Sequence, residues 1–141
     1  MRIPGYLLVG LLVLGGGCDQ LRPDTSDKVF SIDKTVDQAS ADRLGGLLLQ
    51  KVPAIKAEQA ARQQGGKTVQ LIVRVENAPE PGYDGPDRAY HREYYWMYVG
   101  YHGKDSILKY YRYLIHKDTN GAGGGAILFY DDAKDEFVKP S

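Results

Sequence analysis

The stretch Thr68-Val-Gln-Leu-Ile-Val-Arg-Val-Glu76 decides the fold class, because it is the clearest strand signal in the chain. Successive side chains of a β-strand point to opposite faces, so an apolar residue at every second position makes one face apolar. Such a face needs a second layer to cover it. The apolar positions are Val69, Leu71, Val73 and Val75.

The segment on its N-terminal side, Asp33 to Gln64, predicts that covering layer as helix. Apolar residues recur there at spacings of three and four, which places them on one helical face; they are Leu44, Leu47, Leu48, Val52 and Ile55.

Three residues interrupt this helical pattern. Gly45-Gly46 costs about 1 kcal/mol per residue relative to alanine, and Pro53 removes a backbone donor. We therefore expect two helical pieces or one kinked helix, with a break near Lys51–Pro53. Asp33 or Thr35 is expected to cap the first turn.

The segment on the C-terminal side is rich in tyrosine. Tyr90 to His102, YHREYYWMYVGYH, predicts a strand with aromatic residues on both faces. One face carries Tyr95, Met97, Val99 and Tyr101, and the other carries Tyr94, Trp96 and Tyr98. We expect one of these faces to pack on the helix and the other to be partly exposed to water, and the sequence leaves open which is which.

Four further segments complete the element list. Ile107 to Lys117 also fits helical spacing, but its tyrosine and isoleucine content and flanking turns favour a strand. Ala126 to Tyr130 predicts a last strong strand, and Phe137-Val138 an edge segment. Val29 to Ile32 is either a short first strand or a packing arm.

This order of elements predicts an α+β domain, with an N-terminal kinked helix packed on a four-stranded antiparallel meander sheet. In element order alone, the layout resembles cystatin-like and nuclear-transport-factor-like architectures. A fold of this kind does not by itself specify a function.

The N-terminus carries an export pattern. Met1 and Arg2 precede a 12-residue apolar run, Ile3 to Leu14, which is too short for a comfortable membrane span. Three glycines then lead to Cys18, the only cysteine of the chain.

The stretch Leu14-Gly-Gly-Gly-Cys18 resembles the lipobox of bacterial lipoproteins. The resemblance implies removal of residues 1–17, a diacylglycerol thioether on Cys18 and an acylated amine, which together anchor a protein stably. Residues 18–28 would then be the lipidated cysteine and a tether, and residues 29–141 a single domain. The implied location is the periplasmic side of the membrane, with Asp19 favouring the inner membrane and the outer membrane left open.

Charge and motifs exclude several classes of function. Residues 1–17 hold one basic residue, Arg2, and no acid, so the remaining chain carries 17 basic and 18 acidic residues. This balance argues against nucleic acid, which calls for a basic face.

No catalytic or cofactor motif is present. Gly121 to Ala126 matches a GxGxxA string but leads into a strand, so it indicates a hairpin loop and not a phosphate site. The three histidines lack a converging third ligand, and the acids at 131–136 lack calcium-loop spacing. We expect no enzyme activity, no metal and no cofactor.

The tyrosines are the most distinctive feature, since ten of the 11 lie within residues 83–130. Tyrosine, tryptophan and arginine are enriched in protein interfaces, although a β-sheet also favours tyrosine without any partner. We therefore expect an envelope protein partner, as for an inhibitor, an immunity-type factor or an assembly component. The predicted partner-binding residues, together with the loop Asn77 to Arg88, are Tyr83, Arg88, Arg92, Tyr94, Trp96 and Tyr98.

An alternative function is binding of a small ligand, namely a lipid, a glycan or a peptidoglycan fragment. It predicts a cavity between helix and sheet, lined by Leu48, Tyr95 and Met97, where a solid core would count against it.

Overall fold

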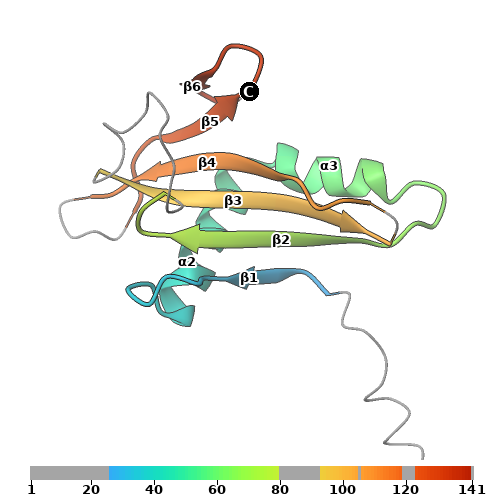
Figure 1. Ribbon diagram of the computed structural model, residues 1–141, viewed down its shortest axis with the longest axis horizontal. Helices are drawn as coiled ribbons and strands as arrows, with labels where there is room; N and C mark the ends of the chain where they lie inside the picture. The colour runs from blue at the N-terminus through green and yellow to red at the C-terminus, as the bar shows by residue number, and fades with distance from the viewer. Residues whose placement is uncertain (1–25, 80–92, 105, 119–122, 141) are drawn as a thin grey trace, which may run out of the picture.

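The computed structural model describes residues 26–79, 93–104, 106–118 and 123–140, and shows two helices on one face of a six-stranded sheet (Figure 1). The strands lie side by side in chain order. The elements are β1 (Lys28–Phe30), α2 (Gln38–Lys51), α3 (Ala54–Arg62), β2 (Val69–Glu76), β3 (Tyr94–Gly103), β4 (Tyr110–His116), β5 (Ile127–Asp131) and β6 (Glu136–Val138).

The α+β class is confirmed, but the sheet is larger than expected and mixed. Strands β2 to β6 form an antiparallel meander, whereas β1 pairs in parallel with β2, with Val29 opposite Val73. The two helices between β1 and β2 return the chain to the end of the sheet from which β1 started, which a parallel pair requires. The expected four-stranded antiparallel sheet was therefore wrong at its edges, where β1 and β6 have only three residues each.

The helical segment forms two separate helices, which confirms the two-piece alternative, whereas the single kinked helix of the expected fold was wrong. The break lies at Val52 and Pro53, where sequence placed it, because proline lacks the N–H that would continue α2. Asp37, and not Asp33 or Thr35, caps α2, and its Oδ1 accepts from the Ser40 N–H at 2.7 Å. The Asp33 carboxylate instead accepts from the backbone N–H groups of Thr35 and Asn77.

Gly45 explains how β1 approaches α2. A Cβ atom at this position would lie 2.7 Å from Val29 Cγ1, whereas at Gly46 it would meet nothing within 4 Å. The first glycine of the pair is thus required for packing, and the second is not. Sequence alone showed only the cost of the pair to helix stability.

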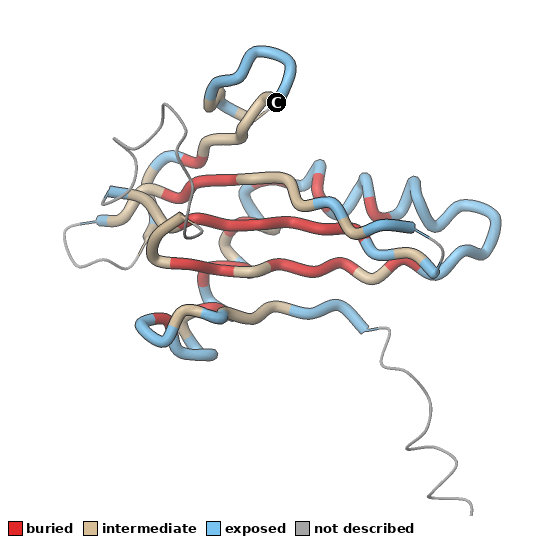
Figure 2. The backbone as a smooth tube through the Cα atoms, in the orientation of Figure 1, coloured by how far each residue is buried: buried red, intermediate tan, exposed pale blue. Residues whose placement is uncertain are grey.

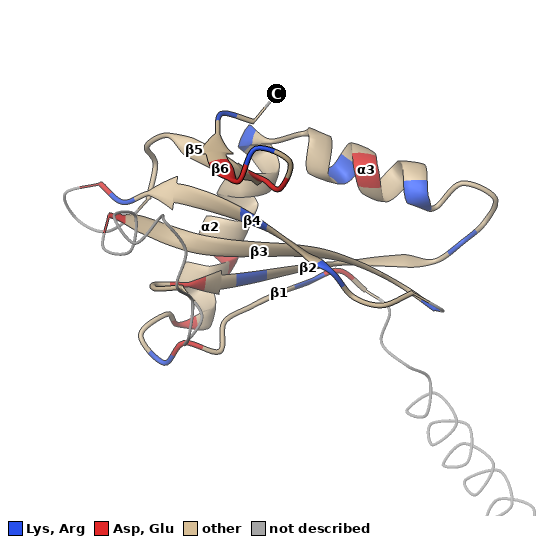
Figure 3. Cartoon of the chain, turned by 45° about the horizontal axis from the view of Figure 1, so that its top comes forward, with Lys and Arg blue, Asp and Glu red and all other residues tan. Residues whose placement is uncertain are grey.

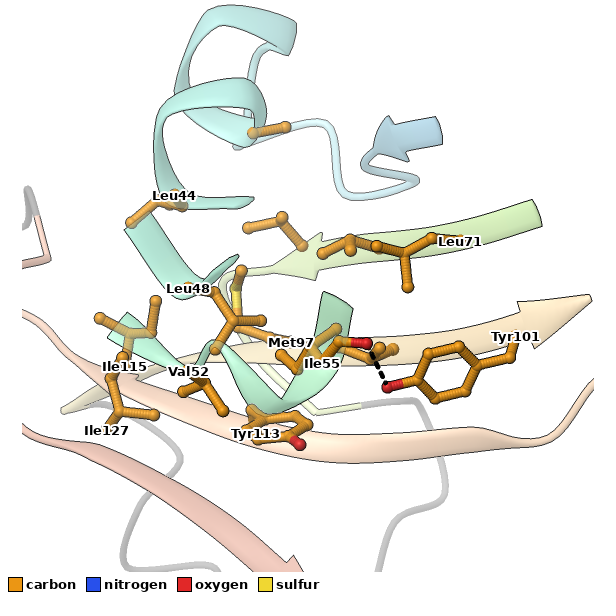
Figure 4. Close-up of a cluster of buried hydrophobic side chains, with 14 of the residues drawn as sticks. Leu44, Leu48, Val52, Ile55, Leu71, Met97, Tyr101, Tyr113, Ile115 and Ile127 are labelled. Carbon is orange, nitrogen blue, oxygen red and sulfur yellow. Dashed lines mark hydrogen bonds between the residues drawn. The ribbon is translucent and has the colours of Figure 1, made fainter. Parts of the chain in front are cut away.

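The main core fills the space between the helices and the sheet (Figure 4). The helices contribute Leu44, Leu48 and Ile55, and the break between them contributes Val52, each no more than 3% exposed. The alternation predicted for β2 and β3 is confirmed, because their apolar positions face this layer. The sheet side of the core comprises Leu71, Val73, Val75, Met97, Val99, Tyr101, Tyr113, Ile115 and Ile127.

Burial is concentrated in the three central strands (Figure 2). The segment that fitted both helix and strand is the strand β4, which confirms the strand alternative. In the described part of the chain, no helix combines the length and the apolar character needed to cross a bilayer.

Candidate functional site

The sheet face opposite α2 and α3, here called the outer face, carries a second and smaller apolar cluster. Its fully or nearly fully buried members are Trp96, Tyr98 and Leu114. Half-buried side chains surround them and come from β3, β4, β5 and β6: Tyr94, Tyr110, Leu128 and Phe137. The face therefore combines a closed apolar floor with partly accessible aromatic residues.

Arginine side chains lie against the tyrosines of this outer face. The Arg74 Cζ atom lies 4.3 Å from the ring centroid of Tyr98 and 5.2 Å from that of Tyr110. Arg112 Cζ lies 3.8 Å from the ring centroid of Tyr130. A guanidinium held over an aromatic ring is attracted to its π face while its edge can still donate hydrogen bonds.

The predicted partner-binding residues divide into three groups in the structure. Trp96 is 0% and Tyr98 4% exposed. A partner on the outer face would therefore contact the residues around these two side chains and not their rings. Tyr94 is half-buried, and its ring lies edge-on to that of His116 at 4.9 Å. The remaining three, Tyr83, Arg88 and Arg92, lie outside the described residues.

The predicted set of partner-binding residues lacks several residues that the strand register brings onto the same face. Tyr98 pairs with Arg112, which puts this arginine beside the tyrosines, and Tyr130 follows from the next strand. The alternation within β4 indicated that Arg112 shares a face with Tyr110, but only the register between strands shows that this face is the one that carries Tyr98.

A polar cluster closes the end of the sheet where β2 ends. The Glu76 carboxylate, 5% exposed, accepts from Ser31 Oγ at 3.2 Å and the Ile32 N–H at 3.3 Å. Lys117 Nζ donates to the side chain and the backbone carbonyl of Asn77. Burial lowers the pKa of Lys117, although the nearby Asp33 carboxylate opposes that shift. The expected loop Asn77 to Arg88 departs from this end, and its residues 80–88 lie outside the described part.

The opposite end of the sheet carries a hollow of about 960 Å³, here called the basic hollow. It lies between the end of α3, the start of β2 and the end of β3. Three cationic residues line it, Arg62, Lys67 and Lys104, and its described lining contains no carboxylate.

A smaller hollow of about 240 Å³, here called the aromatic groove, lies between α3 and the strands β3 to β5. Its lining residues are Ala54, Glu58, Tyr101, Tyr111, Tyr113 and Phe129. The Tyr101 hydroxyl donates to the Ile55 carbonyl at 3.1 Å, and burial raises the pKa of Tyr101. The Arg62 Cζ atom lies 4.8 Å from the same ring.

The cavity expected for a small ligand at Leu48, Tyr95 and Met97 is filled by core. Leu48 and Met97 are both completely buried in the main cluster, with Tyr95 packed against it. The aromatic groove lies beside this position, and none of its lining residues belongs to the expected set.

The described residues contain no group of three histidine, cysteine or acidic side chains placed to hold a metal ion. Ser106 Oγ accepts from the Gly103 N–H at 2.9 Å, so the serine closes the turn after β3. Comparison of the chain with protein families, curated proteins and solved structures finds no match.

Proposed function

We propose that this protein is a lipid-anchored, periplasm-facing module without catalytic activity, which binds an envelope protein through the outer face of its sheet. The observation that carries the proposal is the set of arginine–tyrosine contacts on a sheet face that no described helix covers.

The composition and packing of the outer face support this function. Tyrosine and arginine are the residue types that contribute most to protein interfaces. Here they rest on the buried floor of Trp96 and Leu114, so their positions are set before a partner arrives. Binding then costs less side-chain entropy than it would with mobile residues.

The proposed contact set therefore changes. Tyr94 stays in it, joined by Tyr110, Arg112 and Tyr130, which are all half-buried. Trp96 and Tyr98 support these residues from below, and the loop that holds Tyr83, Arg88 and Arg92 stays a predicted part of the surface. An inhibitor, an immunity-type factor or an assembly component would all use such a face.

Recovery of a partner from membranes tests this function. Affinity purification of the full chain from detergent-extracted membranes should recover one protein in stoichiometric amount. Arg112→Glu and Tyr94→Ala should each abolish that recovery while leaving the circular dichroism spectrum unchanged. Trp96→Ala is unsuitable, because removal of a completely buried indole destabilises the fold.

Arg43→Glu provides the matched control, since it reverses an exposed arginine on α2, on the other side of the sheet. The control should recover the partner like the unmodified chain. If no protein is recovered stoichiometrically, or if the partner is retained by Arg112→Glu, binding through the outer face is refuted.

The proposed anchor has an independent test. Mass spectrometry of the membrane-extracted protein should show cleavage before Cys18 and acyl mass on that residue, and Cys18→Ala should release the protein from the membrane. Density fractionation of membranes should place it with the inner membrane, as Asp19 favours, or with the outer one. A free Cys18 thiol in the extracted protein contradicts the anchor.

The aromatic groove favours a second candidate function, the binding of a glycan or a peptidoglycan fragment. Tyrosine rings provide stacking surfaces, and Glu58 at the rim provides a hydrogen-bond acceptor. Titration of the protein with soluble peptidoglycan fragments should shift NMR signals of groove residues, and Tyr111→Ala should remove the shifts. An unchanged spectrum at saturating fragment excludes this candidate.

A further inference from the structure

The chain enters the domain at the end of the sheet that carries the basic hollow (Figure 1). The Ser26 carbonyl accepts from Gln70 Nε2 at 2.7 Å, and Asp27 Oδ1 accepts from the Leu71 N–H at 3.1 Å. Both contacts lie at the start of β2, and Val69 at that start also lines the hollow. The first described residues are thus held against this end.

This end of the domain has an excess of positive charge (Figure 3). Three described carboxylates at this end are each bound by a cation: Asp27 by Lys56 at 2.8 Å, Glu58 by Arg62 at 2.9 Å, and Asp132 by Lys109 at 3.7 Å. Lys67 and Lys104 are exposed, and neither is paired with a carboxylate in the described part of the chain. Asp105 is next to Lys104 in the sequence and carries one negative charge, and it lies outside the described residues.

The same end presents an apolar side chain to water. Ile107, in the turn between β3 and β4, is 95% exposed, more than any other large apolar residue described. It follows Ser106, which lines the basic hollow. The other exposed large apolar residue, Ile32, lies at the opposite end of the sheet, where its N–H contacts Glu76.

The length of the chain before Ser26 limits which end can face a membrane. Eight residue steps separate Cys18 from Ser26, which span at most about 28 Å when fully extended. The eight residues of β2 are themselves about 26 Å long. A tether that carried the far end of the sheet to the membrane would need nearly its whole length, whereas the near end needs almost none.

From this juxtaposition we propose that the end formed by Lys67, Lys104 and Ile107 docks on an anionic phospholipid surface. The two ammonium groups contact lipid phosphates and Ile107 inserts at the level of the headgroups. Basic residues beside a single exposed apolar residue suit a membrane interface, where charge and burial act together. This proposal rests on the proposed anchor at Cys18, but not on the outer face.

The test places an environment-sensitive fluorophore at position 107. Cys18 is the only cysteine, so the full chain with Cys18→Ser and Ile107→Cys carries one labelling site. The label should shift to shorter wavelength with phosphatidylcholine vesicles that contain phosphatidylglycerol, and spin-labelled lipid should quench it. The same label at Ile32→Cys is the matched control and should show neither effect.

Charge variants distinguish a vesicle response caused by the basic end from one caused by the apolar segment, residues 3–14. Every variant retains that segment. Lys67→Glu with Lys104→Glu should weaken the vesicle response at position 107 at least about tenfold. Lys34→Glu, an exposed lysine at the far end, should leave the response unchanged. The response should also fall in raised salt and with phosphatidylcholine alone.

Three results overturn the proposal: equal responses at positions 107 and 32, no response at either position, or no effect of the double charge reversal. Inorganic phosphate without vesicles provides a fourth arm. If phosphate alone shifts the label at 107 and abolishes the vesicle response, the hollow is a site for a soluble anion. Absence of acylation at Cys18 would instead refute the anchor, and it would be seen separately by mass spectrometry.

Discussion

The ring of Trp96 lies edge-on to the ring of Phe137, with centroids 5.8 Å apart, although three strand spacings separate β3 from β6. In a flat sheet, three spacings amount to about 14 Å. The sheet therefore curls toward its outer face and brings the last strand over the middle of the sheet. This curl buries the indole on a face that no described helix covers.

Removal of this contact should expose the only tryptophan of the chain. Phe137→Ala is expected to lower the free energy of unfolding by about 2 kcal/mol, roughly half the loss for a fully buried phenylalanine. The fluorescence emission of Trp96 should move to longer wavelength. Phe129→Ala, a half-buried phenylalanine on the helix side of β5, should also destabilise the protein but leave the emission maximum unchanged.

The two adjacent glycines of α2 should respond to alanine with opposite signs. Gly46→Ala is expected to raise stability by about 0.5–1 kcal/mol, because alanine favours helix and the position is open. Gly45→Ala should lower it by about 1–3 kcal/mol, because the new methyl group overlaps Val29. Chemical denaturation of both variants measures the difference, and equal shifts would show that β1 does not need the close approach.

Asp27 should contribute to stability at neutral pH and lose that contribution in acid. Burial acts to raise the pKa of this carboxyl, but hydrogen bonds from Lys56, Leu71 and Gln59 outweigh burial and lower it. The contribution is therefore complete above the unfolded pKa of about 3.9 and disappears as the pH falls through the lower folded value.

Asp27→Ala should accordingly cost about 1–2 kcal/mol near neutral pH, because it leaves three donors without their acceptor. The difference from the unmodified protein should shrink in urea titrations below about pH 4. Asp132→Ala removes an exposed pair with Lys109 and should change stability by less than about 0.5 kcal/mol. A loss from Asp27→Ala that persists in acid would show that charge is not its cause.

The hydroxyl of Tyr101 should stabilise the protein only while it is protonated. Tyr101→Phe removes its hydrogen bond to the Ile55 carbonyl and should cost about 1 kcal/mol. Because burial raises the folded pKa of Tyr101, its contribution is full below the unfolded pKa of about 10 and is lost at higher pH. Urea unfolding at neutral and alkaline pH should therefore show a smaller alkaline loss in the variant than in the unmodified chain.

The predictable part of the fold was the part set by local periodicity. Alternation fixed which residues of β2 and β3 face the helices, and Pro53 fixed the break between α2 and α3. A short first strand was one of the two alternatives for Val29 to Ile32, but its parallel pairing was not predictable, because it depends on where the helices return the chain. Gly45 looked like a defect in the helix until its neighbour Val29 was known.

The sequence predicted which residue types form the candidate site, but not how deeply each side chain is buried. Tyr94 and Trp96 were correctly placed on one face of the strand, but the sequence left open which face the helices cover, and only the curl of the sheet determines that the indole is buried. The basic hollow joins two segments that are far apart in the sequence: residues between Ala61 and Val69, and Tyr101, Gly103, Lys104 and Ser106. Neither periodicity nor composition predicts that these segments lie side by side, because their proximity depends on strand register and loop placement.

The parallel pairing of β1 also determines how the domain would respond to mechanical force. A pull on the chain before Ser26, directed away from the domain along β1, loads its three residue pairs with β2 in shear, so they resist together instead of separating one by one. The contacts of Asp27 with Lys56, Gln59 and Leu71 lie ahead of that ladder and take the load first. Tension between an anchored N-terminus and a bound partner would therefore first load the contacts that join the chain to α3 and β2.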